Sequence, residues 1–189
     1  MSKQDSVRVA ILADTHGFLD PRISERVSDC DYAIHAGDVG GADVLCALQP
    51  RIQVVAIRGN NDTAEKWADS ESHFLENLPE HANVELPGGA VVVVHGDDHR
   101  SLNERHRHLR ETYPDARAVI YGHSHKLVMD CDSLPWILNP GAAGRTRTQG
   151  GPSCLILDCH ADKAWEIEAI QLPARKFPNR DSQRRRNTG

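Results

Sequence analysis

The feature that most constrains the fold is a series of short apolar runs in the first two-thirds of the chain. Each run is four to seven residues long and rich in valine and isoleucine, and most end at a glycine or a polar residue. Runs of this length and composition are typical of strands buried on both faces of a sheet. We predict five such strands, at Val7–Ala13, Tyr32–Ala36, Gln53–Ile57, Ala90–Val94 and Ala118–Tyr121.

Segments with helix signals lie between these strands. Asp20 and Pro21 provide an N-cap and a proline for a first helical turn, and Pro114 stops a polar helix. Strands that alternate with helices favour βαβ units and a largely parallel sheet. The predicted helices are Arg22–Cys30, Asp43–Leu48, Glu65–Leu78 and Leu102–Tyr113.

The pattern changes after residue 125, where strand-like segments follow one another with only short loops between them. These segments are Leu127–Asp130, Trp136–Leu138, Ser153–Asp158 and Lys163–Ile170. They predict a second, more antiparallel sheet. Two sheets with helices outside them give an α/β fold, a four-layer α/β/β/α sandwich of two mixed sheets flanked by helices.

The length of 189 residues fits one domain. We place this domain at residues 1–173 and a basic, flexible tail at 174–189. Six arginines and lysines against Asp181 give residues 175–189 a charge of +5, which leaves −10 on the rest of the chain. A solvated end is the preferred interpretation of such a tail, and nucleic-acid binding is the alternative. The acidic body argues against a dedicated nucleic-acid-binding protein.

The sequence carries no membrane or secretion signal. No apolar run approaches the ~20 residues that span a bilayer, and the polar N-terminus lacks a signal-peptide pattern. We therefore predict a cytoplasmic protein that does not bind membranes. The five cysteines are odd in number and form no CxxC pair, which favours reduced thiols over disulfides or zinc ligands.

Potential metal ligands directly follow the five predicted strands. The carboxyl ends of such strands meet at one edge of an α/β sheet, so these side chains are expected to converge. Residues i and i+2 of an extended chain point the same way, so Asp14 and His16 can reach one ion together. His123 and His125 can face the same site for the same reason. The complete set is Asp14, His16, Asp38, Asn60, His95, His123 and His125.

Each of these residues alone has an ordinary explanation. Asp38 by itself would be a turn residue or a helix cap, and His95 a satisfied polar residue. Turn chemistry does not readily explain seven oxygen and nitrogen donors that stand in order at strand ends. The whole set therefore indicates a metal site.

The ordered motifs resemble those of the calcineurin-like metallophosphoesterase family. The chain length and Asn139-Pro140-Gly141 resemble its small bacterial and archaeal phosphodiesterase branch, and the resemblance covers about residues 7–170. The motifs are Asp14-x-His16, Gly37-Asp38, Gly59-Asn60-Asn61-Asp62, Val94-His95-Gly96 and Gly122-His123-Ser124-His125.

The resemblance implies two adjacent metal ions and the same α/β/β/α sandwich. Asp38 would bridge the two ions. Asp14, His16 and His125 would bind the first ion, and Asn60, His95 and His123 the second.

This donor set of imidazoles, carboxylates and one amide suits divalent transition metals. We expect two such ions per chain, Mn²⁺ first, with Fe²⁺, Co²⁺, Ni²⁺ or Zn²⁺ as alternatives. Two ions bring +4 and the two carboxylates bring −2, so the site carries about +2, which attracts phosphate and lowers the pKa of bound water. We predict a phosphoesterase, a phosphodiesterase by preference, in which a hydroxide bound to both metals attacks a small phosphate ester.

Asn60, Asn61 and His95 are the residues we expect to take part in catalysis. Many members of the family have histidine where this chain has Asn61, and an amide cannot protonate a leaving alkoxide. Substrates with acidic leaving groups are therefore expected. Asp62 is either a proton donor or, by preference, the cap of the next helix.

Several alternatives stay open. Arg145 and Arg147 either grip a substrate phosphate or are exposed loop charges. The chain could be a non-catalytic scaffold that binds protein partners, as the small subunit of the retromer coat resembles these proteins but has lost parts of the metal site. It could also be a nuclease whose basic tail grips the strand. The sequence leaves homodimer formation undecided.

Overall fold

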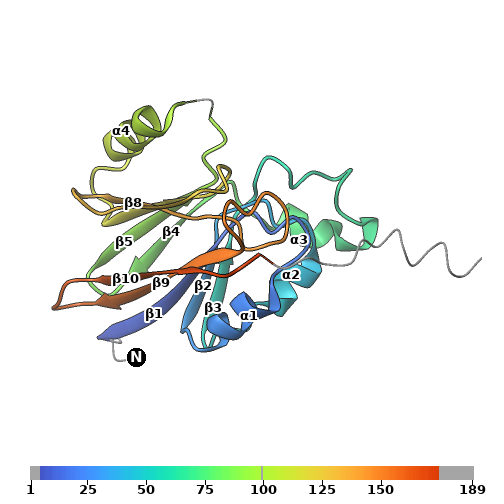
Figure 1. Cartoon of the computed structure of the whole chain (residues 1–189), viewed down its shortest axis with the longest axis horizontal. Helices are drawn as coiled ribbons and strands as arrows, with labels where there is room; N and C mark the ends of the chain where they lie inside the picture. Colours follow the sequence, from blue (N-terminus) through green and yellow to red (C-terminus); the bar gives the residue numbers. More distant parts are fainter. Residues whose placement is uncertain (1–4, 99, 175–189) are drawn as a thin grey trace, which may run out of the picture.

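The computed structural model describes residues 5–98 and 100–174, in which two five-stranded sheets pack face to face with helices on both outer sides (Figure 1). This arrangement confirms the predicted sandwich of two mixed sheets. The basic tail, from residue 175 on, lies outside the described residues.

The first sheet is parallel in its middle and antiparallel at one side. β1 pairs in parallel with β2, and β2 with β3, whereas β9 runs antiparallel to both β1 and β10. The strand order is β10 (Glu166–Gln171), β9 (Ser153–His160), β1 (Ser6–Leu12), β2 (Tyr32–His35) and β3 (Gln53–Ala56).

The second sheet repeats this design. β5, β6 and β8 are parallel neighbours, and the outer strands β4 and β7 pair with them in antiparallel fashion. The strand order is β4 (His81–Leu86), β5 (Gly89–Val94), β6 (Ala118–Tyr121), β8 (Trp136–Pro140) and β7 (Leu127–Asp130).

The helices lie outside the two sheets. In Figure 1, α4 covers the second sheet, and the other helices lie beside the first. Asp20 caps α1 by accepting a hydrogen bond from the Arg22 backbone nitrogen at 3.0 Å, and Ser101 and Glu104 form a capping box at the start of α4. The helical segments are α1 (Pro21–Ser28), α2 (Ala42–Ala47), the 3₁₀ turn η1 (Asp69–Glu71), α3 (Ser72–Glu76) and α4 (Leu102–Thr112).

Three apolar cores follow from the alternation of side chains along each strand. Ile11 of β1 faces the second sheet, whereas its neighbour Leu12 faces the helix side of its own sheet. Leu109 of α4 packs against Val119 of β6 in the third core. Complete burial of each such side chain contributes about 1.5–3 kcal/mol, which fixes which face of every strand points inward.

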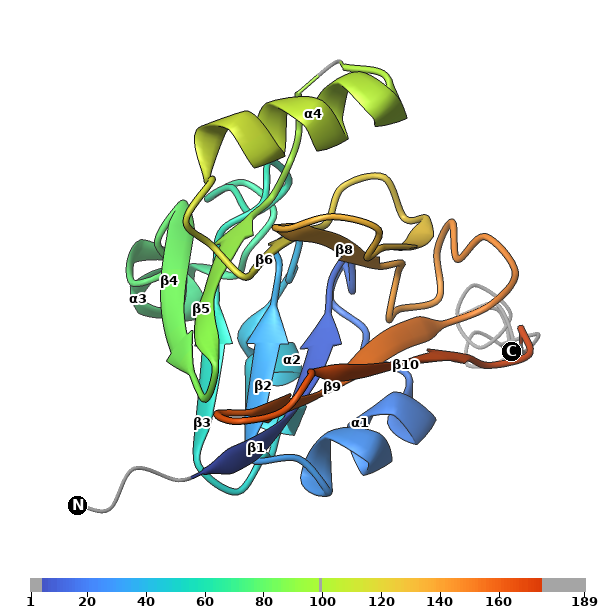
Figure 2. The ribbon, with the colours of Figure 1, turned by 90° about the vertical axis from the view of Figure 1, so that its left-hand side faces the viewer.

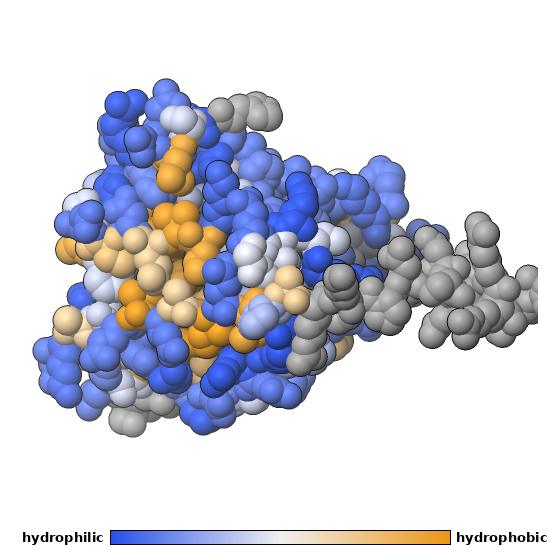
Figure 3. Space-filling view, viewed as in Figure 1, coloured by the Kyte–Doolittle hydropathy of each residue, from blue (hydrophilic) through white to orange (hydrophobic). Residues whose placement is uncertain are grey.

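The inter-sheet core reaches the surface where the edge strands of the two sheets lie above one another. Leu127, Trp136 and Ile167 are only partly buried there, and Met129 and Leu134 are exposed. Figure 3 shows an apolar band across this face of the molecule, between α4 and the lower sheet.

The prediction that the strands after residue 125 form their own sheet is wrong. β7 and β8 join β6 in the second sheet, and β9 and β10 extend the first sheet beside β1. Sheet membership depends on pairing between distant segments, such as Val9 of β1 with Leu157 of β9. Local hydrophobic patterns do not encode such pairing, although they do place the strands.

Two further local predictions need correction. The helix expected at Glu65–Leu78 is confined to η1 and α3, because the segment before them forms a loop tied by Asp62 to the backbone of Val39 and Gly40. Strand β4 was missed, because its exposed positions carry polar residues and only Val84 and Leu86 are buried. No helix among the described residues is long and apolar enough to cross a membrane.

Candidate metal centre

The seven predicted ligands come together at one end of the sandwich. They lie on the loops that follow β1, β2, β3, β5 and β6. Figure 2 shows the arrowheads of β1 and β2 pointing towards this same end. The order of strands and ligands along the chain is therefore converted into a cluster in space, as expected for an α/β sheet. Their role as metal ligands stays a prediction.

The backbone of this cluster is unusual. Asp14, His16, Asp38, His123 and His125 all have positive φ angles, between 48° and 63°. Residues other than glycine rarely adopt this left-handed conformation, and they do so mainly at functional sites where the surroundings enforce it. Extended geometry was expected to orient the D-x-H and H-x-H pairs, so the turn geometry corrects that argument while bringing the same side chains together.

A glycine makes one close approach within the cluster possible. A side chain at Gly59 would collide with the backbone nitrogen and the carboxylate of Asp38. The loops after β2 and β3 could not lie against each other with any larger residue at that position.

Asp14, His16 and His125 form the first group of candidate ligands. The Nε2 atoms of His16 and His125 are 3.1 Å apart, and His125 Nε2 is 3.7 Å from Asp14 Oδ1. The imidazole rings of His16 and His125 stack, with their centroids 5.1 Å apart. Asp14 is fully buried and His125 nearly so, whereas His16 is half-buried.

Asn60, His95 and His123 form the second group. Asn60 Oδ1 lies 3.0 Å from His95 Nε2 and 3.2 Å from His123 Nδ1. The carbonyl of Ala36 lies 2.9 Å from His95 Nδ1, so that nitrogen must donate. The opposite nitrogen, Nε2, therefore offers its lone pair to the cluster in the neutral ring.

Asp38 lies between the two groups. Its Oδ1 is 3.5 Å from His95 Nε2, and its Oδ2 is 3.7 Å from His16 Nε2. One carboxylate thus presents one oxygen to each group, which is the geometry required of a bridging ligand. Donor atoms of Asp14, Asp38 and His95 also lie within 4.8 Å of one another, so Asp14 is close to the second group as well as to the first.

These separations fit donors arranged around metal ions. Two donors at about 2.0–2.2 Å from one ion, at right angles or tetrahedral angles, are about 3.0–3.5 Å from each other. A second indication is that Asp14 Oδ2 is buried without any hydrogen-bond partner. Buried carboxylate oxygens without a partner are costly. The spacing of the donors and the unpartnered oxygen therefore both fit a site that binds divalent cations.

The electrostatics show the same deficit of positive charge. Burial, together with the nearby Asp38 carboxylate, raises the pKa of Asp14 to about 7. Burial would also raise the pKa of Asp38, but hydrogen bonds and charge from His95 and hydrogen bonds from Asn61 hold it below its usual range. Burial and the Arg147 guanidinium lower the pKa of His125 to about 4, which leaves that imidazole neutral and able to ligate.

Asn61 supports Asp38 rather than standing apart from it. Its backbone nitrogen donates to Asp38 Oδ1 and its side-chain nitrogen to Asp38 Oδ2, both at 2.8 Å. Lys66 Nζ donates to the amide oxygen of Asn61, a contact that the motifs do not indicate. The positively charged Lys66 side chain therefore lies beside Asn61, the position at which many family members have histidine.

Asp62 does not cap a helix, contrary to the preferred prediction. Its carboxylate accepts from the backbone nitrogens of Val39, Gly40 and Gly59 and from Trp67 Nε1, at 2.8–3.1 Å. The contacts with Val39 and Gly40 hold the loop after β3 against the loop after β2, and those with Gly59 and Trp67 fix the loop after β3 itself. The side chain is buried and committed to this role, which leaves the proton-donor alternative without structural support.

The two arginines of the loop after β8 differ in position. Arg145 Cζ lies 4.7 Å from the centre of the Phe18 ring. Arg147 Nη2 lies 3.3 Å from His16 Nε2, at the first group of ligands. The sequence could not separate them, because they share a loop and are only two residues apart.

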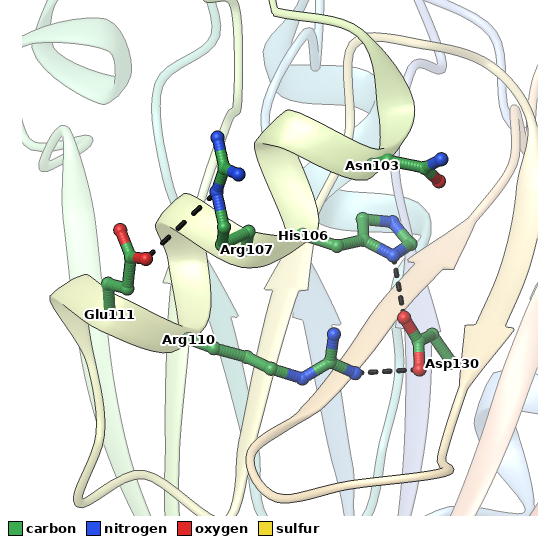
Figure 4. A pocket seen from close by; sticks show the side chains of 6 residues that line it. All are labelled: Asn103, His106, Arg107, Arg110, Glu111 and Asp130. Atoms are coloured by element: carbon green, nitrogen blue, oxygen red, sulfur yellow. Dashed lines mark hydrogen bonds and ion pairs between the residues drawn. The ribbon is translucent and has the colours of Figure 1, made fainter.

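Two buried histidines outside the ligand set also support the loops. His35 Nε2 lies 2.9 Å from Thr15 Oγ1, which in turn donates to the carbonyl of Val39 at 2.9 Å. His106 of α4 connects Asp130, at 2.8 Å, to the hydroxyl of Tyr121, at 3.1 Å. Figure 4 shows His106 and Arg110 converging on Asp130. Neither histidine stands at a ligand position of the motifs, and no spacing rule identifies the partners of either one.

Comparisons with known proteins identify the family of the chain. A family model described as a calcineurin-like phosphoesterase superfamily domain matches residues 7–162. A probable metallophosphoesterase of Methanocaldococcus jannaschii is 28% identical over 141 residues, which is 71% of this chain and 67% of that protein. A phosphodiesterase of the same archaeon is 26% identical over 173 residues, which is 85% of this chain and 98% of that protein.

A solved structure extends the comparison of folds. Vacuolar protein sorting 29 from Cryptosporidium parvum matches with a TM-score of 0.66 at 16% identity, over 90% of this chain and 100% of that one. At this identity the match supports the shared fold alone.

Proposed function

The chain belongs to the calcineurin-like phosphoesterase superfamily, and from this we propose that it is a dinuclear metal-dependent phosphoesterase that hydrolyses small phosphate esters, phosphodiesters by preference. The observation that carries the proposal is Asp38, whose two oxygens face two separate groups of candidate ligands. A carboxylate placed in this way can hold two metal ions close enough to act on one phosphate.

The chemistry follows from the donors and their charges. Two divalent transition-metal ions, Mn²⁺ first, would offset the buried carboxylates, polarise the phosphate and activate a water molecule for attack on phosphorus. Asn61 holds Asp38 through two hydrogen bonds, and the Ala36 carbonyl holds the ring of His95, so both ligands are oriented in advance. The side-chain oxygen of Asn60 lies within hydrogen-bond distance of both His95 and His123, so these three candidate ligands face one another.

The preference for diesters rests on what surrounds Asn61. Neither oxygen of Asp38 nor the amide of Asn61 supplies a proton to a leaving group. A metal site of this kind suits substrates whose leaving group departs without protonation. The name of the archaeal phosphodiesterase that the chain resembles supports the same preference.

Substrate and metal assays test this function directly. Metal-depleted protein should hydrolyse neither bis(p-nitrophenyl) phosphate nor p-nitrophenyl phosphate, and added Mn²⁺ should restore turnover, with the diester as the better substrate. Parallel additions of Fe²⁺, Co²⁺, Ni²⁺ and Zn²⁺ rank the metals. No turnover with any of them would contradict the proposal.

The role of Asn61 has its own test. Asn61→His introduces a group that can donate a proton, so it should improve hydrolysis of alkyl phosphodiesters more than that of p-nitrophenyl diesters. An equal change for both leaving groups would show that leaving-group protonation is not what the asparagine withholds.

A scaffold that binds a protein partner is the second candidate. It is favoured by the structural match to vacuolar protein sorting 29 and by the apolar band in Figure 3. The seven intact ligand positions favour the enzyme instead. Purified protein that contains no metal and shows no turnover would support the scaffold.

A further inference from the structure

Arg145 and Arg147 form a natural comparison within one loop. Arg145 lies over the ring of Phe18, with Cζ 4.7 Å from its centre. Arg147 reaches the candidate metal centre, with Nη2 3.3 Å from His16 Nε2. Both side chains are exposed, so general solvation does not explain the difference.

The loop is held in place beside the ligands. Gln149 donates from its side chain to the Ser124 carbonyl at 3.2 Å and from its backbone to the Arg147 carbonyl at 2.9 Å. Ser124 lies between His123 and His125 in the sequence. Arg147 itself has a φ of 53°, a conformation that side-chain-bearing residues rarely adopt away from functional sites.

The nitrogen that faces Arg147 is also a candidate metal ligand. His16 Nε2 lies 3.1 Å from His125 Nε2 and 3.7 Å from Asp38 Oδ2. One lone pair of an imidazole cannot both accept a hydrogen bond from arginine and bind a metal ion. When metal occupies His16, the guanidinium therefore has to leave that nitrogen.

The charge balance indicates what Arg147 contacts next. A guanidinium keeps its positive charge at any physiological pH. Two divalent cations and two carboxylates already leave the centre at about +2, so Arg147 is repelled there until an anion arrives. Phosphate oxygens match the planar fork of a guanidinium, which can donate two parallel hydrogen bonds to them.

We propose that Arg147 binds a non-bridging oxygen of the substrate phosphate, exchanging its contact with His16 for that anion when the metal centre is loaded. This proposal rests on the phosphoesterase function stated above. It assigns Arg147 to substrate binding and leaves Arg145 as a loop residue that packs on Phe18.

The test uses two glutamine variants of the full chain, Arg147→Gln and Arg145→Gln. Calorimetry first measures Mn²⁺ binding to each metal-depleted protein, and then inorganic phosphate binding to each Mn²⁺-loaded protein. Arg147→Gln should bind Mn²⁺ about two- to tenfold more tightly, because it removes a competing cation. It should bind phosphate at least about tenfold more weakly, because it removes a charged hydrogen bond.

The opposite signs of these two changes distinguish substrate binding from a structural role, which would weaken both. Arg145→Gln should change neither affinity by more than about twofold. Arg147→Lys retains the charge without the planar fork, and should keep part of the phosphate affinity. In kinetics, Arg147→Gln should reduce kcat/KM for bis(p-nitrophenyl) phosphate and for p-nitrophenyl phosphate, because both present a non-bridging oxygen to the guanidinium.

The outcomes separate this proposal from the function on which it rests. Normal Mn²⁺ binding with unchanged phosphate affinity in Arg147→Gln would overturn the assignment of Arg147 alone, as would an equal loss in Arg145→Gln. Failure of the unaltered protein to bind Mn²⁺ or any of Fe²⁺, Co²⁺, Ni²⁺ and Zn²⁺ would overturn the proposed function and this assignment together.

Discussion

Two polar clusters of this protein, built from similar side chains, differ in whether they are complete. Around His106, every polar group has a partner within the protein: Asp130 accepts from His106 and Arg110, and Tyr121 contacts the other ring nitrogen. At the candidate metal centre, Asp14 Oδ2 is buried without a partner. His95 Nε2 meets two acceptor oxygens, those of Asn60 and Asp38.

The difference indicates which cluster binds a ligand. A complete network of hydrogen bonds stabilises the fold and gains nothing from an ion. An incomplete one, with a buried carboxylate oxygen that no donor reaches, is stabilised by a bound cation. Both clusters contain histidine and aspartate, so residue type alone does not distinguish them.

The largest effect is expected from Asp14→Asn, which alters the incomplete cluster. The substitution keeps the shape and removes a buried negative charge, so activity should fall by about three orders of magnitude or more through loss of metal. The stability of the metal-depleted protein should not fall, because the carboxylate that it loses has an unpartnered oxygen. Turnover and urea unfolding without metal measure the two effects. A large loss of stability would show that the site is complete without metal.

Metal removal should have the next largest effect. At a Mn²⁺ concentration about 100 times its dissociation constant, binding adds about 2.7 kcal/mol to the free energy of unfolding, which corresponds to roughly 5–10 °C in Tm for a chain of this size. Thermal unfolding with Mn²⁺ and with a chelator measures the shift. Asp14→Asn serves as the control and should show little of it.

The complete cluster should respond in the opposite manner. His106→Phe leaves Asp130 and the buried Tyr121 hydroxyl each short of a partner, so the free energy of unfolding should fall by about 1–3 kcal/mol. Because no candidate ligand is altered, the stabilisation by Mn²⁺ should remain. A variant that lost its response to Mn²⁺ would connect the two clusters in a way that their separate hydrogen-bond networks do not.

The smallest effect is expected at Lys66, at the exposed edge of the candidate metal centre. Lys66→Gln removes the cation beside Asn61, and because Lys66 is exposed, kcat/KM for a diester should fall by less than about tenfold. The loss should shrink further at high salt, which screens exposed charges. A loss as large as that in Asp14→Asn would place Lys66 among the essential groups.

Much of the fold could be predicted, because buried strands and helix caps have patterns that can be recognised in a short stretch of sequence. Continuous apolar runs such as Ala118–Tyr121 and caps such as Asp20 depend on neighbouring residues alone. The pairing of β9 with β1 could not, since its partners are almost 150 residues apart. The half-polar strand β4 shows the same limit, because its outward face resembles a loop.

The sequence by itself determined the donors and their order, because an α/β chain brings strand ends to one edge and leaves the residues after each strand there. The family resemblance already implied two groups of donors with Asp38 between them. The structure adds the distances from each Asp38 oxygen to a histidine of each group, and it shows that Arg147 rather than Arg145 meets His16. These features depend on loop conformations, which left-handed turns and contacts between loops fix together. Such contacts join residues far apart in the chain, so no local pattern specifies them.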